Sequence, residues 1–409
     1  MKILLLTQYF WPESFRINDV ALGLRERGHE VCVATGMPNY PGGRLFKGYS
    51  FFGPFRDRFE SVDVRRAPLL VRGDGGPIRL ALNYISLAAS LALLAPWMAR
   101  GRFDAILVYQ PSPITIGIPA RVIKLLKRLP IVFWVQDLWP QTLSATGAVN
   151  SPMLIAAVDR LVRWIYRGCD RVLVQSRAFV DPIAAQGVPR ERIVYVPNSA
   201  EDFYRRVAPA SADPAAREFR AGFRVLFAGN IGAAQDFPTI IAAANMLREH
   251  REIQWIVIGE GRMHGWVDAE IRKLGLASTF QLLGPRPAEQ MPAYFAHADV
   301  LLATLRRDPI FAYTIPSKIQ SYMACGKAVI VALEGEGAKV VSEAGAGWVV
   351  PPENPAALAE SVLAASRADK TQLKIMGNQG EKYFREQFER SMLLTRLESV
   401  LSEAAGGGV

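Results

Sequence analysis

The sequence predicts an α/β protein with two parallel-sheet domains in tandem. Short apolar runs alternate with helix-length amphipathic segments, and this alternation occurs twice along the 409 residues. A chain of this length exceeds what one hydrophobic core usually supports. The expected strands are too apolar to be half exposed, so each sheet should be parallel and covered by helices on both faces. Each half is therefore expected to be a doubly wound sheet.

In the first half, a buried strand, an amphipathic helix and a second strand follow one another directly. These are "KILLLTQ", then "INDVALGLRERG" ending at Gly28, then "HEVCVATG". Three further apolar strands are separated by helix-length segments: "FDAILVYQ", "PIVFWVQD" and "DRVLVQS". The order indicates repeated strand–helix–strand units.

The second half repeats the pattern with "FRVLFAGN", "IQWIVIGEG", "TFQLLGP", "ADVLLATL", "KAVIVAL" and "AGWVVPP". Between the halves, residues 194–216 are rich in Pro, Ala and polar residues, which favours a linker. Residues 380–404 are expected to form one long amphipathic helix. We therefore expect domains at 1–200 and 201–380, with a helix in 381–409 that packs back toward the N-terminal domain.

The positive charge is concentrated in the first half. Residues 1–200 contain 25 Lys and Arg against 14 Asp and Glu, whereas residues 201–409 contain 23 against 24. An anionic membrane surface or nucleic acid could attract such a half, but no nucleic-acid-binding motif is present. The three cysteines are scattered, which argues against a disulfide framework or zinc site and favours a reducing cytoplasm. No leader peptide is expected at the N-terminus.

Residues 80–99 contain no charge and are flanked by Arg79 and Arg100. Three interpretations stay open: a helix of the domain core, a helix lying in the membrane interface, or a membrane span. The nearby segment 120–130 has the pattern of a small cationic amphipathic helix. Together the two segments could dock the domain on a membrane, or the cationic face could simply be solvated.

Three strand-to-helix loops in the second half could bind an anion. They are "FAGNIGAAQDF" (227–237), "VIGEGRM" (257–263) and "TIPSKIQ" (314–320). Such loops offer backbone N–H groups and the positive end of a helix dipole. Neither G-x-x-x-x-G-K-[ST] nor an early G-x-G-x-x-G is present, so a P-loop NTPase and a dinucleotide-dependent dehydrogenase are disfavoured.

The order of these motifs, with "RGHEVCVATG", "VPNSAEDFY", "LLGPRPAEQMPAYFAHADVLLATL", "PSKIQSYMACGKAVI" and "EAGAGWVVPPENPAALAE", resembles family 4 glycosyltransferases. The resemblance implies the GT-B fold, with two Rossmann-like domains facing an interdomain cleft, and retaining, metal-independent transfer. "QDLWPQTLSATG" and "GNIGAAQ" resemble the WbuB-like fucosaminyltransferase subgroup of surface-polysaccharide assembly.

The resemblance also implies roles for residues of the second half. It assigns the loop after the first strand to the donor diphosphate, the next glycine turn to the nucleotide, a Pro-Arg pair to the base, and a helix N-terminus to the phosphates. In that order, the donor-binding residues would be Gly229, Asn230, Gly232 and Gln235, then Glu260, Gly261 and Arg262, then Pro285 and Arg286, then Ser317, Lys318, Ile319 and Ser321.

The chain departs from the family pattern at several charged positions. Asn230 and Gln235 stand where the family has an Arg and a Lys, Tyr313 and Ser321 replace two glutamates, and Gln136 replaces a histidine. Charge-assisted hydrogen bonds contribute roughly 1.5–3 kcal/mol each. Lys318 is therefore the expected phosphate cation, because a first-turn lysine opposes the helix dipole unless an anion binds there. Arg262, or the pair Arg306 and Arg307, could support it, and a surface lysine is the alternative.

In the first half, Asp137 and Glu13 are the candidate catalytic carboxylates, alongside Lys318. Asp137 follows a strand and could hold a substrate hydroxyl or cap the next segment. Glu13 lies in the first strand-to-helix loop and could orient the acceptor, accept its proton, or be structural. Arg16 could contact an acceptor diphosphate. The four histidines are interpreted as structural.

The expected protein is a hexosyltransferase-type enzyme on the cytoplasmic membrane surface. It would move N-acetylfucosamine or another N-acetylated sugar from a UDP-sugar to an undecaprenyl-diphosphate-linked glycan in O-antigen, capsule or exopolysaccharide biosynthesis. No cofactor, metal or nucleic acid is expected. Two alternatives stay open: a non-hydrolysing nucleotide-sugar epimerase, which shares the fold, and a catalytically silent nucleotide-sugar-binding subunit.

Overall fold

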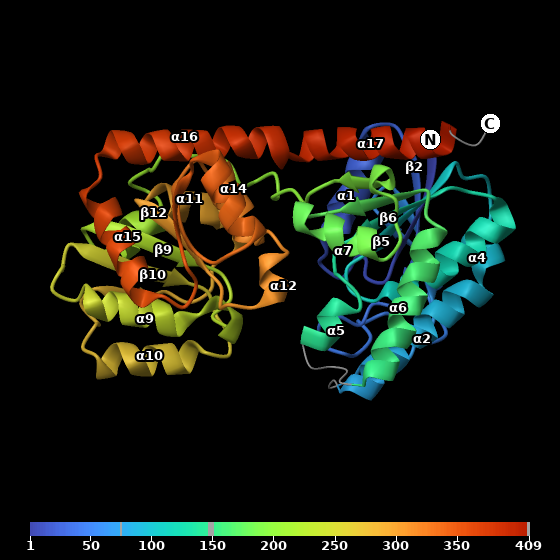
Figure 1. The fold of residues 1–409 in the computed structure, drawn as a ribbon, viewed down its shortest axis with the longest axis horizontal. Helices are drawn as coiled ribbons and strands as arrows, with labels where there is room; N and C mark the ends of the chain where they lie inside the picture. The colour runs from blue at the N-terminus through green and yellow to red at the C-terminus, as the bar shows by residue number, and fades with distance from the viewer. Residues whose placement is uncertain (74–75, 146–150, 407–409) are drawn as a thin grey trace. The chain divides into compact units, whose positions relative to one another are not determined.

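The computed structural model describes residues 1–73, 76–145 and 151–406, and the chain divides into two compact units. Unit 1 comprises Met1–Val196 together with the residues from Leu394 onward, and unit 2 comprises Pro197–Leu393. Each unit is built on its own sheet, and many of the helices and strands are labelled in Figure 1. The first boundary therefore falls four residues before the one expected at residue 200.

Unit 1 contains an eight-stranded sheet in the order β3-β4-β2-β1-β5-β6-β7-β8. Every neighbouring pair is parallel except β3 and β4, so the prediction of a doubly wound parallel sheet is confirmed. The strands are β1 Lys2–Thr7, β2 Glu30–Gly36, β3 Arg56–Phe59, β4 Val62–Ala67, β5 Ala105–Gln110, β6 Ile131–Val135, β7 Arg171–Val174 and β8 Ile193–Tyr195.

The apolar runs do not predict β3, β4 or β8. β3 and β4 together contain six charged residues, which the fold accommodates because β3 forms an edge of the sheet and Arg66 on β4 finds buried polar partners. β8 forms the opposite edge, and its three residues are only partly buried. Two of them belong to the stretch that composition alone assigns to the linker.

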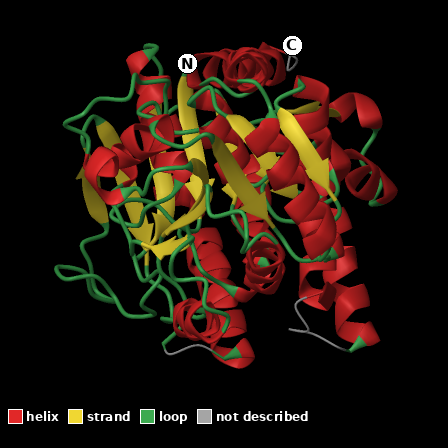
Figure 2. Ribbon diagram, turned by 90° about the vertical axis from the view of Figure 1, so that its left-hand side faces the viewer, coloured by secondary structure: helices red, strands yellow, loops and turns green. Residues whose placement is uncertain are grey.

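The helices of unit 1 connect and cover these strands (Figures 1 and 2). They are α1 Arg16–Glu26, α2 Pro77–Leu93, α3 Ala95–Met98, α4 Gly117–Lys127, α5 Gln141–Ala145, α6 Pro152–Arg167 and α7 Val180–Ala185. Residues 80–99 thus form most of α2 and all of α3. In the described ranges, no helix is both long and apolar enough to cross a bilayer. Asn83 fixes α2 to the core: fully buried, it accepts a hydrogen bond from Gln8 (2.9 Å) and donates one to the Leu70 carbonyl (2.7 Å).

Unit 2 contains a six-stranded, all-parallel sheet in the order β11-β10-β9-β12-β13-β14. The strands are β9 Phe223–Ala228, β10 Ile253–Ile258, β11 Phe280–Leu282, β12 Val300–Thr304, β13 Ala328–Ala332 and β14 Gly347–Val350. The helices are α8 Pro214–Glu218, α9 Phe237–Met246, α10 His264–Lys273, α11 Met291–Ala296, α12 Pro309–Ala312, α13 Ser317–Ala324, α14 Glu336–Ala344, α15 Pro355–Arg367 and α16 Lys370–Gln387.

Two hydrophobic clusters lie on the two faces of this sheet. On β9, Val225 and Phe227 belong to one cluster, and Leu226 and Ala228 belong to the other. Successive side chains of a strand point to opposite faces, so both faces of β9 are buried. Burial on both faces explains why such strands appear as continuous apolar runs in the sequence.

The expectation of one helix over residues 380–404 is wrong. α16 ends at Gln387, and α17 begins at Arg390 and continues to Gly406. Phe388, between them, is fully buried in unit 2 and has a non-helical backbone (φ −128°, ψ −3°). Its burial in the core explains the break, which an amphipathic pattern does not reveal.

From Leu394 onward, α17 belongs to unit 1. Its residues Leu397 and Leu401 are fully buried. Glu398 accepts hydrogen bonds from Arg27 (2.6 Å) and His29 (2.7 Å). These contacts show that the helix is part of the unit 1 core.

Candidate functional site

A pocket of about 470 Å³ opens in unit 2 beside the first turn of α13. We call it the α13 pocket. It lies at the carboxyl ends of β9 and β10, which is where open parallel sheets bind ligands. Its lining residues are Glu201, Tyr204, Ala228, Gly229, Asn230, Ile258, Gly259, Pro285, Arg286, Ala288, Met291, Phe295, Ser317, Lys318, Ser321 and Tyr322.

The helix α13 presents its N-terminus to this pocket. Pro316 occupies the N-cap position and no side chain caps the first turn, so Ser317 is the first helical residue. Gly326 follows the C-cap with φ +65°, in the left-handed conformation expected of it. The buried Tyr322 hydroxyl donates to the Ala228 carbonyl (3.3 Å) and accepts from the Ala228 N–H (3.1 Å). This pair of bonds fixes α13 against the end of β9.

Lys318 is the cation of the α13 pocket. Its Nζ lies 3.5 Å from the centroid of the Phe227 ring. Burial lowers the pKa of Lys318 to about 7. Within the described residues, no carboxylate forms an ion pair with it, so the ring is its main electrostatic partner. A lysine held in this way offers its three N–H donors to a ligand rather than to the protein.

Two glycines let the backbone approach this lysine closely. Gly229 has φ +131°, and a Cβ there would lie 2.6 Å from Lys318 Cε. Gly259 has φ +152°, and a Cβ there would lie 1.8 Å from the Gly229 carbonyl oxygen. Side chains at either position would displace the loop or the lysine, so these two turns need glycine.

The loop after β9 carries amides where the related family carries cations. Asn230 donates from Nδ2 to Gln235 Oε1 at 3.2 Å, so the two side chains bond to each other. Asn230 lines the α13 pocket, whereas Gln235 and Gly232 do not. The amides therefore shape the loop, and they leave the positive charge of the pocket to Lys318 and Arg286.

Arg286, which also lines the pocket, is held by a second polar group. Its guanidinium donates to the Tyr294 hydroxyl and to Glu218, each at 3.0 Å. The hydrogen bond to Tyr294 and the charge of Glu218 raise the pKa of Arg286. Because Glu218 neutralises it, Arg286 is better suited to position a ligand than to supply net charge.

The structure brings together seven of the thirteen predicted donor-binding residues. Gly229, Asn230, Pro285, Arg286, Ser317, Lys318 and Ser321 line the pocket. Six do not: Gly232, Gln235, Glu260, Gly261, Arg262 and Ile319. Ile319 is fully buried in the core beneath α13 and Arg262 is exposed. The Ser321 hydroxyl donates to the Ser317 carbonyl at 3.1 Å.

Sequence reasoning missed the apolar and aromatic part of the lining. This part of the lining consists of Tyr204, Met291, Phe295 and Tyr322. Met291 and Phe295 are four residues apart on α11, a spacing that puts both on one helix face. This spacing is the signal in the sequence that could have revealed the apolar lining, but the same spacing also occurs in ordinary core helices.

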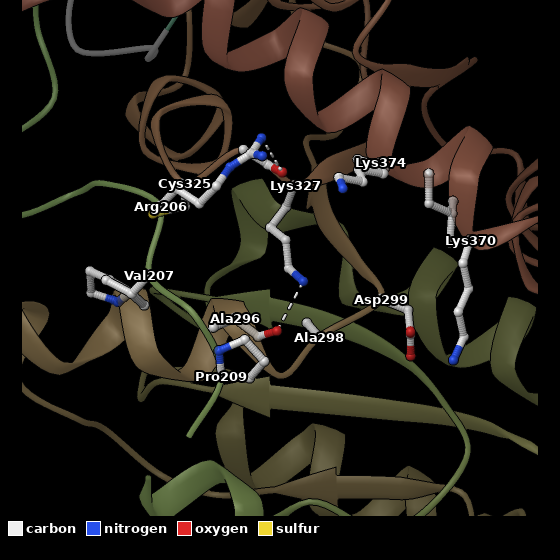
Figure 3. A pocket seen from close by; sticks show the side chains of 14 residues that line it. Arg206, Val207, Pro209, Ala296, Ala298, Asp299, Cys325, Lys327, Lys370 and Lys374 are labelled. Atoms are coloured by element: carbon white, nitrogen blue, oxygen red, sulfur yellow. Dashed lines mark hydrogen bonds between the residues drawn. The ribbon is translucent and has the colours of Figure 1, made fainter. Parts of the chain in front are cut away.

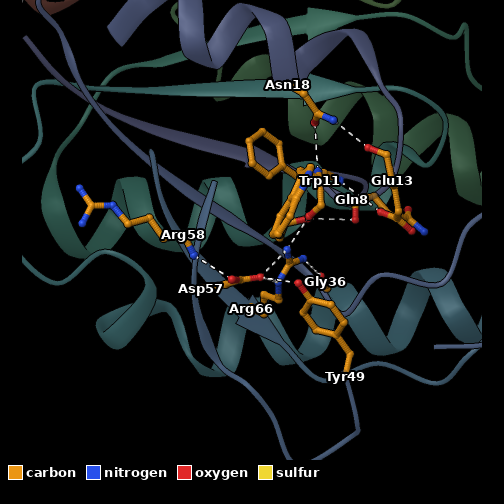
Figure 4. Close-up of polar contacts among 11 residues, drawn as sticks. Gln8, Trp11, Glu13, Asn18, Gly36, Tyr49, Asp57, Arg58 and Arg66 are labelled. Atoms are coloured by element: carbon orange, nitrogen blue, oxygen red, sulfur yellow. Dashed lines mark hydrogen bonds and ion pairs between the residues drawn. The ribbon is translucent and has the colours of Figure 1, made fainter. Parts of the chain in front are cut away.

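In unit 1, Glu13 lies at the centre of a closed hydrogen-bond network (Figure 4). Its Oε1 accepts from the backbone N–H groups of Asn39 (2.8 Å) and Tyr40 (2.7 Å), and its Oε2 accepts from that of Phe10 (3.2 Å). Burial raises the pKa of Glu13 to about 7 in spite of these bonds. The carboxylate thus joins the loop after β1 to the loop after β2.

Arg66 extends this network beneath Glu13 (Figure 4). Its side chain is fully buried, and it donates to Asp57 (3.1 Å) and to the carbonyls of Gly36 (3.2 Å) and Trp11 (2.5 Å). The Tyr49 ring lies 4.9 Å from the guanidinium carbon. Because the protein itself supplies hydrogen-bond partners for this buried arginine, we interpret Arg66 as a residue that holds the surrounding loops together and not as a ligand-binding residue.

Asp137 follows β6, as expected, and its carboxylate is also engaged. It accepts from the Thr142 hydroxyl (2.5 Å) and from the Trp139 indole N–H (3.1 Å). Burial raises its pKa. Arg16 is the first residue of α1 and is partly buried. The final two residues of "QDLWPQTLSATG", Thr146 and Gly147, lie outside the described residues.

Metal binding has no obvious place in the described ranges, where no cluster of three His, Cys, Asp or Glu side chains is positioned to hold an ion. The groups that line the α13 pocket supply the following chemistry. One partly buried lysine, a helix N-terminus and two glycine turns form an anion-binding wall. Aromatic and apolar side chains also line the pocket, and a flat ring can pack on them.

Two known protein families match the chain, one in each half. The family described as "Glycosyl transferase 4-like domain" matches residues 14–199, and "Glycosyl transferases group 1" matches residues 222–389. WcaI of Escherichia coli (strain K12), assigned as a colanic acid biosynthesis glycosyl transferase, is 25% identical over 349 residues. That alignment covers 82% of this chain and 84% of WcaI.

Solved structures share the fold over nearly the whole chain. Anabaena Alr3699/HepE, solved in complex with UDP, has a TM-score of 0.71 at 16% identity. The match covers 98% of this chain and 100% of the Alr3699/HepE chain. Sucrose-phosphate synthase from Thermosynechococcus elongatus has a TM-score of 0.75 at 14% identity, with 100% of both chains covered. Together with the two family matches, these likenesses identify the chain as a glycosyltransferase with the GT-B fold.

Proposed function

We propose that the chain transfers a sugar, with retention of configuration, from a UDP-sugar to a polyprenyl-diphosphate-linked glycan. The observation that carries this proposal is the unpaired Lys318 beside the N-terminus of α13. A diphosphate placed there would meet the lysine ammonium and the backbone N–H groups of Ser317 and Lys318, whereas the Ile319 N–H already donates to the Pro316 carbonyl (3.0 Å). Alr3699/HepE, which shares the fold, was solved with UDP.

The α13 pocket also has space for the rest of the nucleotide. The Tyr204, Met291 and Phe295 wall suits the flat face of a base, and Arg286 and Pro285 lie at the same end. Glu201, which lines the pocket, is an exposed acid that could accept hydrogen bonds from ribose hydroxyls. These contacts favour a nucleoside diphosphate over a bare phosphate.

In the proposed step, the bond between the anomeric carbon and the diphosphate oxygen breaks, and the acceptor oxygen bonds to that carbon on the same face. The acceptor proton passes to the departing diphosphate. Lys318 and the α13 N–H groups stabilise the negative charge that develops on the leaving group. No metal is required by this scheme, because the charge compensation comes from the chain itself.

For the acceptor we propose unit 1, where Arg16, Asp137 and Glu13 follow the carboxyl ends of β1 and β6. Arg16 would contact the acceptor diphosphate, and Asp137 would orient a hydroxyl. The closed contacts of Glu13 favour an indirect role, in which it holds the loop that binds the acceptor. The similarity to WcaI, a colanic acid biosynthesis glycosyl transferase by its name, supports a place in surface-polysaccharide biosynthesis, such as O-antigen, capsule or exopolysaccharide. The donor sugar proposed here, N-acetylfucosamine or another N-acetylated sugar, rests on the sequence resemblance alone.

Peripheral docking on the cytoplasmic membrane is also proposed for unit 1. α2 contacts α4, and α4 contacts α6. These helices expose large apolar side chains: Ile78, Ile85, Leu93, Leu125 and Met153 are 58–81% exposed. Segment 120–130 contains four cations, Arg121, Lys124, Lys127 and Arg128. Two of them bond to other parts of unit 1, since Lys124 pairs with Asp170 (2.5 Å) and Arg121 donates to the Trp164 carbonyl (2.6 Å). The docking would therefore rest mainly on apolar insertion.

The transfer is tested by incubating the purified protein with a panel of nucleotide sugars and a polyprenyl-diphosphate glycan. The expected product is a lengthened lipid-linked glycan whose new linkage keeps the anomeric configuration of the donor, as read by NMR. Conversion of the donor without an acceptor would instead indicate an epimerase. Nucleotide binding without any turnover would indicate a silent subunit.

The docking is tested by flotation with vesicles that contain anionic lipid. The double variant Ile78→Gln/Leu93→Gln is expected to lose most of its flotation. Ile375→Gln, at a 51% exposed position on α16 of unit 2, is the matched control and should float like the unaltered protein. Equal flotation of all three would overturn the docking surface.

A further inference from the structure

A second pocket lies in unit 2, at the end of the sheet where β12 and β13 begin (Figure 3). We call it the β13 pocket, because Lys327 in its lining directly precedes β13. It has a volume of about 280 Å³. Asp299, which precedes β12, also lines it, so it borders the amino ends of strands whose carboxyl ends lie on the side of the α13 pocket.

Positive charge dominates the β13 pocket. Arg206, Lys327, Lys370 and Lys374 line it, and Asp299 is the sole carboxylate in the lining. They come from the segment before α8, the turn before β13, and the first two turns of α16 (Figure 3). Arg206 pairs with Glu381, but no ion pair with a described residue compensates the three lysines, and gathering them around one small cavity is unfavourable unless an anion binds there.

Lys327 is the most enclosed of these cations. Its Nζ donates to the Ala296 carbonyl oxygen at 3.0 Å. Burial lowers the pKa of Lys327, the nearby charge of Asp299 opposes that effect, and the charge of Arg206 adds to it. Asp299 is itself engaged, because its Oδ2 accepts from the Arg224 N–H at 2.8 Å. In the ranges that the structure describes, Lys327 has no carboxylate within ion-pair distance.

The other cations differ in how firmly they are held. Arg206 donates to Asn378 (2.7 Å) and to the Gly326 carbonyl (3.2 Å) and pairs with Glu381 (2.8 Å), which fixes its position. Lys370 and Lys374 are exposed, and neither is in an ion pair with a described residue. They stand one helical turn apart on α16 and can turn toward the same ligand.

We propose that the β13 pocket binds a small phosphate-bearing anion, at a site separate from the α13 pocket. Phosphate oxygens would accept hydrogen bonds from Lys327, Lys370 and Lys374, with the fixed Arg206 beside them. The remaining lining is apolar, with Val207, Pro209 and Leu373 among it, so a carbon skeleton attached to the phosphate can pack there. The volume is small for a ligand pocket, which favours inorganic pyrophosphate or a sugar phosphate over a whole nucleotide.

The test separates this site from the α13 pocket by working in a Lys318→Gln background. Inorganic pyrophosphate and glucose 6-phosphate are titrated separately by calorimetry at constant ionic strength. We expect at least one probe to bind, and Lys370→Gln/Lys374→Gln to weaken that binding about tenfold. A preference for one probe would identify the ligand as inorganic or as a sugar phosphate. Lys382→Gln is the matched control, because Lys382 is exposed on α16 but does not line the pocket.

A second variant tests the enclosed cation. Lys327→Met is expected to weaken probe binding at least as much as the double variant does. Thermal unfolding of every variant shows that the loss is not caused by misfolding, and the exposed double variant decides the matter if Lys327→Met does not fold. Absence of binding of both probes in the Lys318→Gln background, or equal binding by the Lys370/Lys374 and Lys382 variants, would overturn the proposal.

Discussion

Glu13 in unit 1, which is buried, and Lys318 in unit 2, which is partly buried, are both ionisable groups with shifted pKa values, yet their surroundings are opposite. Burial moves both pKa values to about 7, upward for the carboxyl and downward for the ammonium. Three backbone N–H groups bind the Glu13 carboxylate, whereas an aromatic ring is the neighbour of the Lys318 ammonium. A shifted pKa alone therefore does not mark a ligand site. The presence or absence of protein partners distinguishes the two.

The contrast is tested most strongly by Lys318→Met. Methionine keeps much of the chain length and packs on Phe227 but carries no charge, so the leaving diphosphate loses its cation. We expect kcat/KM to fall by roughly 100–1,000-fold, as when one donor to a developing oxyanion is removed. The free energy of unfolding should stay the same or rise, because an unpaired, partly buried charge is removed.

Lys339→Gln is the control for that variant, since Lys339 lies on the exposed side of α14 and pairs with Glu343. It should keep full activity. If Lys318→Met kept full activity, or lost stability along with activity, Lys318 would be a structural residue and the contrast would fail.

Glu13→Gln tests the other side of the comparison. The glutamine oxygen can still accept from Asn39 and Tyr40, but its NH₂ group then faces the Phe10 N–H, donor against donor. We expect the free energy of unfolding to fall by about 1–3 kcal/mol, the usual effect of leaving a buried donor unpaired. Chemical denaturation measures it.

The activity of Glu13→Gln decides between its two possible roles. If Glu13 only holds the acceptor loop, the fall in kcat/KM should come mainly from a higher KM for the acceptor. That result would agree with a structural role. A large loss in kcat with normal stability would show that Glu13 acts on the acceptor directly.

The pH dependence of UDP binding follows from the lowered pKa of Lys318. Above pH 7 the folded protein releases the lysine proton, and a neutral amine attracts the diphosphate less. UDP affinity should therefore fall between pH 7 and 9, by up to about tenfold per pH unit. Calorimetry should show no such fall in Lys318→Met.

The stability of the unliganded protein should change with the opposite sign. Between pH 7 and 10.5 the unfolded chain keeps the proton that the folded chain has released, so raising the pH favours the folded state. Unfolding free energies of the unaltered protein should rise over this range relative to Lys318→Met. Parallel curves for the two proteins would mean that the lysine titrates normally.

Asn230→Ala should have the smallest effect. The Asn230 amide bonds to Gln235 within the loop and carries no net charge. We expect UDP affinity to weaken by about two- to tenfold, since a neutral hydrogen bond contributes roughly 0.5–1.5 kcal/mol. A loss as large as that of Lys318→Met would show that the amides are the main phosphate ligands.

Much of the fold could be predicted because its strands are buried on both faces. In a chain where strands and helices alternate, short continuous apolar runs such as "KILLLT" and "IQWIVI" are compatible with little else than a strand buried on both faces. β3 and β4 escaped prediction because their burial depends on charge pairing: the buried Arg66 pairs with Asp57 nine residues earlier in the chain. Such pairing leaves no periodic pattern.

The site was predictable where backbone geometry sets the residue type. Gly229 and the start of α13 were found because a left-handed glycine and a helix N-terminus have local signals. The placement of Phe227 beneath Lys318, and the bonding of Asn230 to Gln235, depend on side-chain directions that no local pattern encodes. For the same reason the sequence could not show that Glu13 is enclosed by backbone donors.

The return of α17 to unit 1 has a consequence for synthesis on the ribosome. Unit 2 lies entirely between the two segments of unit 1, and at roughly 5–20 residues per second its synthesis takes on the order of 10–40 s. During that interval unit 1 lacks the helix that supplies the fully buried Leu397 and Leu401. Residues 1–196 therefore lack part of the unit 1 core during that time, whereas unit 2 has its whole sequence available to fold before unit 1 is complete.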